Sequence, residues 1–122
     1  KVDVDQNGTI KTFDVGAIIV AVGSSLLDAK GILGYDGNKR ITQYELESML
    51  KNKEIKEKDF VMIQCAGSRN EERPYCSSVC CMTALKNALN IKELNPETHV
   101  TILFRDLYTP GTSYEEYYRK AR

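Results

Sequence analysis

The chain has 122 residues, and its 17 basic side chains balance its 17 acidic side chains. This balance argues against a partner that is bound through bulk charge, such as nucleic acid or an anionic membrane surface. A hydrophobic content of 42% with 28% charged residues is typical of one folded domain. The longest apolar run, residues 15–22, is too short to cross a bilayer, so we expect no membrane span.

The first third of the chain predicts a β-hairpin, a buried strand and a loop. Asn7-Gly8 is a strong hairpin signal between the strand-like stretches Val2–Asp5 and Ile10–Phe13. The run Gly16–Gly23 is continuous and rich in β-branched residues, which favours a strand buried on both faces of a sheet. Residues 24–39 show little periodicity and several glycines, which indicates a loop.

The remaining residues predict alternating helices and strands. Thr42 with Glu45 forms a capping-box pattern, and Ser113 with Glu116 repeats this pattern near the end of the chain. The elements expected are a helix over 43–52, a strand over 60–64, a helix over 79–94, a strand over 99–104 and a final helix that opens at Ser113. This order indicates a layered α/β fold, in which the helix over 79–94 is a right-handed crossover between parallel strands.

All cysteines fall in one short segment, between a predicted strand end and a predicted helix start. They are Cys65, Cys76, Cys80 and Cys81. With Cys76 and Cys80 on the first turns of the helix, the four thiols converge on one volume. The helix N-terminus lowers thiol pKa values, and Arg69 and Arg73 offset the charge of several thiolates. Such a cluster favours a metal or redox site over a disulfide framework.

The cysteine spacing by itself leaves several functions open. One isolated ligand and two adjacent ligands suit a tetrahedral zinc poorly, whereas an iron–sulfur cubane tolerates this arrangement better. A non-catalytic zinc-binding or protein-docking module and a dithiol redox switch remain alternatives. The segment Cys65–Arg69 occupies the place of a dinucleotide-binding loop, but it lacks the GxGxxG pattern, which argues against nicotinamide binding.

Two stretches, VMIQCAGSRN (61–70) and PYCSSVCCMTALK (74–86), closely resemble the A subunit of heterodisulfide reductase. The resemblance continues through IKE (91–93), TILFRD (101–106) and YEEYY (114–118), and the run Val15–Gly23 is similar to a strand before the flavin site of that family. It therefore covers nearly the whole chain.

The resemblance implies an iron–sulfur flavoprotein oxidoreductase that works with partner subunits, and these partners reduce the disulfide of coenzyme M and coenzyme B. It implies that the partners are other heterodisulfide reductase subunits and electron-donor proteins, and that the location is cytoplasmic. The resemblance leaves open whether the protein forms a homodimer. The implied fold is Rossmann-like and similar to thioredoxin reductase, with a mainly parallel sheet. The four cysteines then bind a four-iron four-sulfur cluster that relays electrons to or from FAD in the full-length parent.

By the same resemblance, we expect this chain to be a fragment that is inactive alone and holds no catalytic residue. Residues 1–23 are then the tail of the flavin-binding domain, 24–58 a connecting loop and short helix, and 59–122 the Rossmann-like unit that bears the cluster. The residues expected to contact cofactors are Ala21, Val22, Gly23, Gly67, Ser68 and Arg69.

Overall fold

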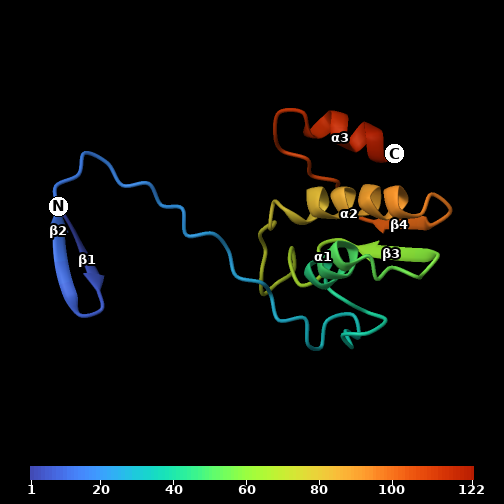
Figure 1. Ribbon diagram of the computed structural model, residues 1–122, viewed down its shortest axis with the longest axis horizontal. Helices are drawn as coiled ribbons and strands as arrows, with labels where there is room; N and C mark the ends of the chain where they lie inside the picture. Colours follow the sequence, from blue (N-terminus) through green and yellow to red (C-terminus); the bar gives the residue numbers. More distant parts are fainter.

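The computed structural model describes the whole chain, residues 1–122. A β-hairpin stands apart from an α/β unit, and an extended segment joins the two (Figure 1). The structure is mixed α/β, with one antiparallel and one parallel two-stranded sheet. The expected α/β class is therefore present, but as two separate two-stranded sheets, of which only β3–β4 is parallel, and a Rossmann-like fold with a mainly parallel sheet stays a prediction.

The hairpin forms as predicted. Strand β1 (Val2–Gln6) pairs antiparallel with β2 (Thr9–Phe13), and Gln6 lies opposite Thr9. The two turn residues, Asn7 and Gly8, have φ angles of 54° and 81°. Positive φ at both positions is the geometry that an Asn-Gly turn provides between twisted strands.

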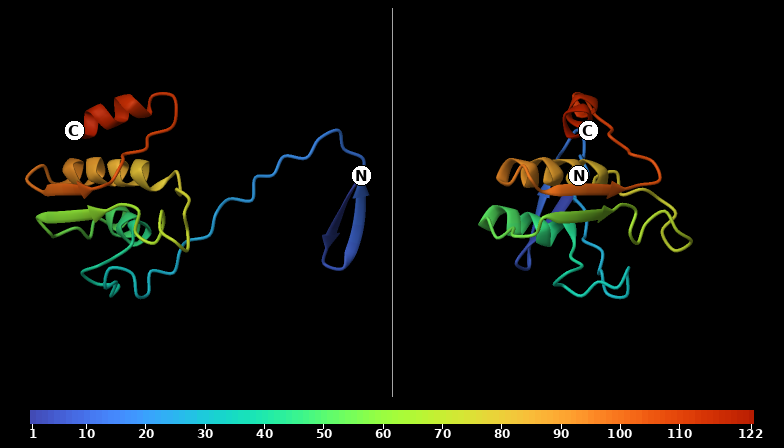
Figure 2. Two further views of the ribbon diagram at one scale, coloured as in Figure 1. Left: turned by 180° about the vertical axis from the view of Figure 1, so that it is seen from behind. Right: turned by 90° about the vertical axis from the view of Figure 1, so that its right-hand side faces the viewer.

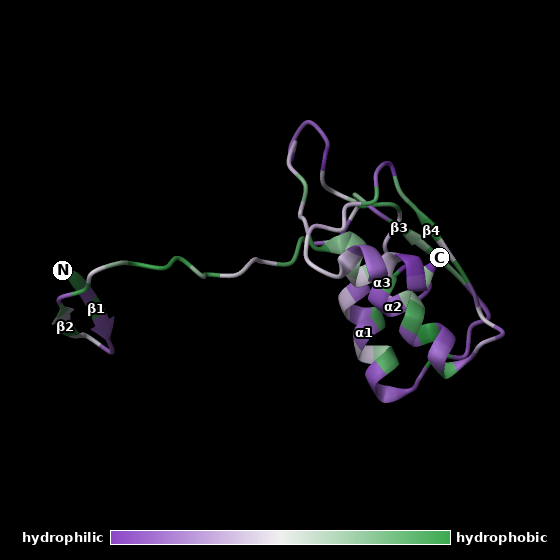
Figure 3. Ribbon diagram, turned by 90° about the horizontal axis from the view of Figure 1, so that it is seen from above, coloured by the Kyte–Doolittle hydropathy of each residue, from purple (hydrophilic) through white to green (hydrophobic).

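The buried strand expected over Gly16–Gly23 is wrong for this chain. These residues belong to no strand and are exposed throughout, and Ile19 and Val22 are each 90% exposed. Figure 3 shows this hydrophobic segment running alone between the hairpin and the α/β unit. A strand needs a neighbour that pairs its backbone N–H and C=O groups, and no strand of this chain lies beside the segment.

The α/β unit is a strand–helix–strand crossover with a second helix beside it. Strands β3 (Asp59–Ile63) and β4 (His99–Leu103) pair in parallel, and α2 (Cys80–Leu94) connects them. Helix α1 (Gln43–Asn52) has the bounds that the sequence predicts. The predicted elements between residues 43 and 104 are thus confirmed to within one residue at each end.

The core lies between the helices and one face of the β3–β4 sheet. Six buried side chains form it, from α1, β3 and α2: Leu46, Leu50, Met62, Ala84, Ala88 and Ile91. Val100 and Ile102 of β4 pack against this cluster from the same face. The opposite face, which carries Val61, Ile63 and Leu103, is exposed. Figure 2 shows α1 and α2 beside the two strands, with α3 farther out next to α2.

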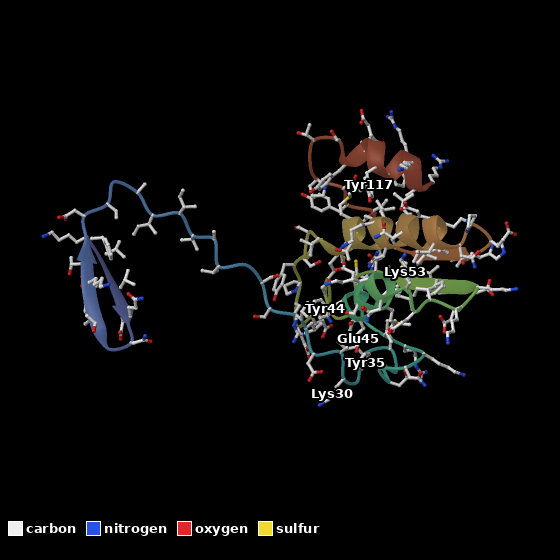
Figure 4. The ribbon with its side chains drawn as sticks, in the orientation of Figure 1. Lys30, Tyr35, Tyr44, Glu45, Lys53 and Tyr117 are labelled. Carbon is white, nitrogen blue, oxygen red and sulfur yellow. The ribbon has the colours of Figure 1, made fainter.

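Helix α1 is fixed at its start by the predicted capping box and by the loop before it. The Thr42 hydroxyl accepts a hydrogen bond from the Glu45 backbone, and the Glu45 carboxylate accepts one from the Thr42 backbone. The Tyr35 hydroxyl donates to the same carboxylate, and Figure 4 shows both side chains between the loop and the helix.

Helix α3 (Tyr114–Ala121) forms, but its predicted capping box does not. Ser113 has a φ of 69°, and its side chain makes no capping hydrogen bond, because this left-handed backbone differs from the extended one that a capping residue adopts. The helix lies beside α2 (Figure 1). No helix of the chain combines the length and the apolar character that a bilayer crossing demands.

Candidate cysteine site

The candidate site lies where the two parallel strands end. The carboxyl ends of parallel strands meet at one edge of a sheet, which is where α/β folds place ligands. Cys65 follows β3 at this edge. The Gln64 backbone N–H still pairs with the Leu103 carbonyl at 2.9 Å, and its side-chain amide lies 3.4 Å from the Cys80 carbonyl. Gln64 therefore ties the strand end to the first turn of α2.

Cys80 and Cys81 are the first two residues of α2. The preceding residue, Val79, makes no side-chain cap. The N–H groups of this first turn are therefore free to interact with thiolate charge, as are those at any uncapped helix N-terminus. Cys76 precedes the helix, so the expectation that Cys76 and Cys80 share its first turns is wrong.

The Cys81 thiol is affected electrostatically by the thiols of Cys80 and Cys65. Burial raises the pKa of the Cys81 thiol, a backbone hydrogen bond from Tyr108 opposes this rise, and the neighbouring thiols of Cys80 and Cys65 raise the pKa further. Thiols that affect each other in this way would repel as thiolates. A cation beside them would remove this repulsion.

Cys76 lies on the loop between Cys65 and α2. The Arg69 backbone N–H donates to the Tyr75 carbonyl at 3.3 Å, which folds this loop back on itself before Cys76. The Cys76 side chain is exposed, and its sulfur lies 3.3 Å from the Ser78 backbone nitrogen. Cys76 is therefore the one exposed cysteine, whereas Cys65 and Cys80 are half-buried and Cys81 is buried.

The donor set has the chemistry of an iron–sulfur ligand set. Four thiols come from one segment, and none of them is in a disulfide. In this conformation no three chelating side chains are close enough together to hold a metal ion. Metal binding by all four would thus require these cysteine side chains, and above all the exposed Cys76, to move closer together.

The two arginines of the loop have different surroundings. Arg69 Nη1 lies 3.9 Å from the Cys65 sulfur, and Arg69 Nη2 lies 2.8 Å from an Asp106 carboxylate oxygen. Asp106 and, secondly, Cys65 raise the pKa of Arg69. Arg73 instead pairs with Glu72 at 3.1 Å. The structure therefore places only Arg69 beside a thiol.

The remaining residues expected at a cofactor site fall into two groups. A Cβ atom built on Gly67 would lie 2.3 Å from Leu27 and 2.9 Å from Ile32, so side chains of this chain fill the space beside that glycine. Ser68 donates its backbone N–H to the Cys65 carbonyl within the same turn. The other group lies exposed on the extended segment: Ala21, Val22 and Gly23.

Sequence reasoning missed the part of the site that follows β4. Asp106, which pairs with Arg69, and Tyr108, whose backbone lies beside Cys81, belong to this part. A signal for them existed, since the predicted crossover makes β3 and β4 parallel, and residues just after both strands then share one edge.

No family model matches the chain, but individual relatives do. It is 43% identical to the iron-sulfur A subunit of the CoB–CoM heterodisulfide reductase of Methanocaldococcus jannaschii, over 97% of this chain and 20% of that protein. It is 40% identical to the A subunit of the H2/formate:CoB-CoM heterodisulfide,ferredoxin reductase of Methanococcus maripaludis, again over 97% and 20%. It is 38% identical to the A subunit of the Ferredoxin/F420H2-dependent CoB-CoM heterodisulfide reductase of Methanosarcina acetivorans, over 99% and 17%.

Each match covers nearly the whole chain, and the chain spans about a fifth of the length of these relatives. The resemblance drawn from the cysteine segment is thereby confirmed. The chain belongs to the A-subunit family of heterodisulfide reductases.

Proposed function

We propose that residues 59–122 form an electron-transfer unit that binds one four-iron four-sulfur cluster through its four cysteines. The observation that carries the proposal is a contact between the end of β3, where Cys65 follows, and the start of α2, where Cys80 and Cys81 lie: the Gln64 side-chain amide is 3.4 Å from the Cys80 carbonyl. Cys76 lies on the loop between these two positions. Such a cluster, when bound, accepts and donates single electrons. The name of the Methanocaldococcus jannaschii relative, which describes an iron-sulfur subunit, supports this assignment.

The chain's own residues would hold and tune this centre. The four thiolates are the ligands, and the N–H groups at the start of α2 offset part of their negative charge. Arg69 adds a fixed positive charge beside Cys65. Burial of Cys81 keeps water from one side of the site.

In the longer protein, we propose that this unit relays electrons to or from FAD during reduction of the coenzyme M–coenzyme B disulfide. Other subunits and electron-donor proteins would be its partners, in keeping with the names of the relatives. A Rossmann-like parent domain would extend the β3–β4 sheet, and residues 1–23 would complete a flavin-binding domain. The cofactor contacts expected of Ala21, Val22, Gly23, Gly67, Ser68 and Arg69 stay predictions for that longer protein.

The direct test is the iron and acid-labile sulfide content of the chain after anaerobic reconstitution. We expect both, together with thiolate–iron charge-transfer absorption. Cys80→Ser should reduce the iron content and absorption while the circular dichroism spectrum is retained. Ser77→Ala, in the same loop, is the matched control and should change neither.

Three results would contradict the proposal. Zinc without iron would favour a zinc-binding module. Absence of any metal together with a reversible loss of two thiols on mild oxidation would favour a dithiol switch. Equal iron content in wild type and Cys80→Ser would remove Cys80 from the ligand set.

A further inference from the structure

The loop that follows β4 contacts the cysteine loop through two bonds to Arg69, whose side chain lies beside the Cys65 thiol. Asp106 forms an ion pair with Arg69 at 2.8 Å, and Arg105 Nη1 donates to the Arg69 carbonyl at 3.1 Å. Arg69 and Asp106 are 37 positions apart in the chain, so their ion pair connects two distant segments. The two strand-end loops are therefore held together at Arg69.

The Arg69 guanidinium is divided between two neighbours. One terminal nitrogen, Nη2, faces the Asp106 carboxylate, and the other, Nη1, faces the Cys65 sulfur at 3.9 Å. A guanidinium is planar and rigid, so an acceptor that fixes one nitrogen also fixes the direction of the other. The Arg69 side chain is 31% exposed, while that of Asp106 is 75% exposed. Asp106 thus bonds the Arg69 guanidinium in its partly buried position beside the Cys65 thiol.

We propose that Asp106 is a positioning residue that acts through Arg69 on the redox centre ligated by Cys65. This inference rests on the proposed function. Through its hydrogen bond, Asp106 keeps the Arg69 charge beside the Cys65 sulfur, where that charge stabilises the more negative, reduced state of the centre. Asp106 itself does not touch any sulfur.

Two substitutions of Asp106 separate positioning from simple charge. Asp106→Asn and Asp106→Ala remove the same negative charge, but only the asparagine retains a side-chain oxygen that accepts from Arg69. In the alanine variant Arg69 is released toward solvent. We therefore expect the midpoint potential of Asp106→Ala to be lower than that of Asp106→Asn. At the same applied potential, the ratio of reduced to oxidised protein should be at least threefold lower in the alanine variant. That is about 30 mV, given about 59 mV for a tenfold change in a one-electron couple.

The same pair of variants in an Arg69→Gln background provides the decisive comparison. Without the guanidinium there is nothing to position, so the two potentials should coincide. Glu72→Gln and Glu72→Ala are the matched control, because Glu72 pairs with Arg73 in the same loop and Arg73 contacts no sulfur. These two variants should have the same potential as each other.

The outcomes distinguish this inference from the function on which it rests. If the reconstituted wild-type chain contains no iron and no sulfide, both the proposed function and this role of Asp106 are contradicted. Intact iron and sulfide, with equal potentials for Asp106→Asn and Asp106→Ala, would overturn the positioning role alone. A difference that persists in the Arg69→Gln background would also overturn it.

Discussion

The hydroxyl of Tyr35 lies 2.6 Å from Oε1 of Glu45, so the loop before α1 is bonded to the first turn of that helix. The other Glu45 carboxylate oxygen accepts from the Thr42 backbone at 2.6 Å and from the Thr42 hydroxyl at 2.7 Å. One carboxylate thus both caps the helix and anchors the loop.

This carboxylate makes the stability of the α/β unit sensitive to acid. Hydrogen bonds from Tyr35, and then from Thr42, lower the pKa of Glu45 from its ordinary value of 4.5. A lowered folded pKa contributes stability that is fully present above pH 4.5 and is lost as the pH falls through the folded value. We expect Tyr35→Phe to reduce this loss, measured as the free energy of urea unfolding between pH 7 and pH 3. An unchanged slope in Glu45→Gln would contradict this source of acid sensitivity.

Removing the helix cap should destabilise the unit by a measurable amount. Thr42→Ala deletes the hydroxyl that accepts from the Glu45 backbone at 3.2 Å. We expect a loss of about 1 kcal/mol in the free energy of urea unfolding. Ser48→Ala is the control, because the Ser48 hydroxyl bonds back to the Tyr44 carbonyl within the same helix, and its loss should be neutral or slightly stabilising. Equal effects of the two variants would contradict the capping role.

A methyl group at position 67 should disturb the packing beneath the cysteine loop. Gly67 has a φ of +74°, and its added Cβ would meet Leu27 at 2.3 Å. Gly31→Ala is the control, because Gly31 has a φ of +77° but open space around it. We expect Gly31→Ala to lower the unfolding free energy by about 1 kcal/mol through backbone strain, and Gly67→Ala by about 1–3 kcal/mol more through the clash. Equal midpoint temperatures of thermal unfolding in the two variants would contradict this clash, because the Leu27 side chain would then move aside at no cost in free energy.

Charged residues on the extended segment should leave the fold unaffected. Ile19 and Val22 are each 90% exposed, so lysine at either position removes no buried contact. We expect changes within about 0.5 kcal/mol in unfolding free energy, and higher solubility because an exposed apolar run is broken. A loss of several kcal/mol would instead mean that the segment packs as a buried strand in solution.

The elements that could be predicted from the sequence are those specified by local signals. Asn7-Gly8 specifies the hairpin turn by its tolerance of positive φ, and Thr42 with Glu45 specifies the start of α1. The apolar periodicity of residues 60–104 likewise predicts the β3–α2–β4 crossover. Ser113 and Glu116 carry the same local pattern as Thr42 and Glu45, yet the backbone at Ser113 is left-handed, so this cap fails.

The sequence by itself determined which thiols are present, their confinement to one segment, and the family to which they point, because residue type and spacing are properties of the chain alone. Only the tertiary structure decided which groups surround them. It paired Asp106 with Arg69, brought the Tyr108 backbone to Cys81, and left the Cys76 side chain exposed. It also left Gly16–Gly23 exposed, since a run suited to a sheet interior is buried only where neighbouring strands pair with it. Contacts between residues distant in the chain depend on how strands and loops meet in space, which local patterns do not encode.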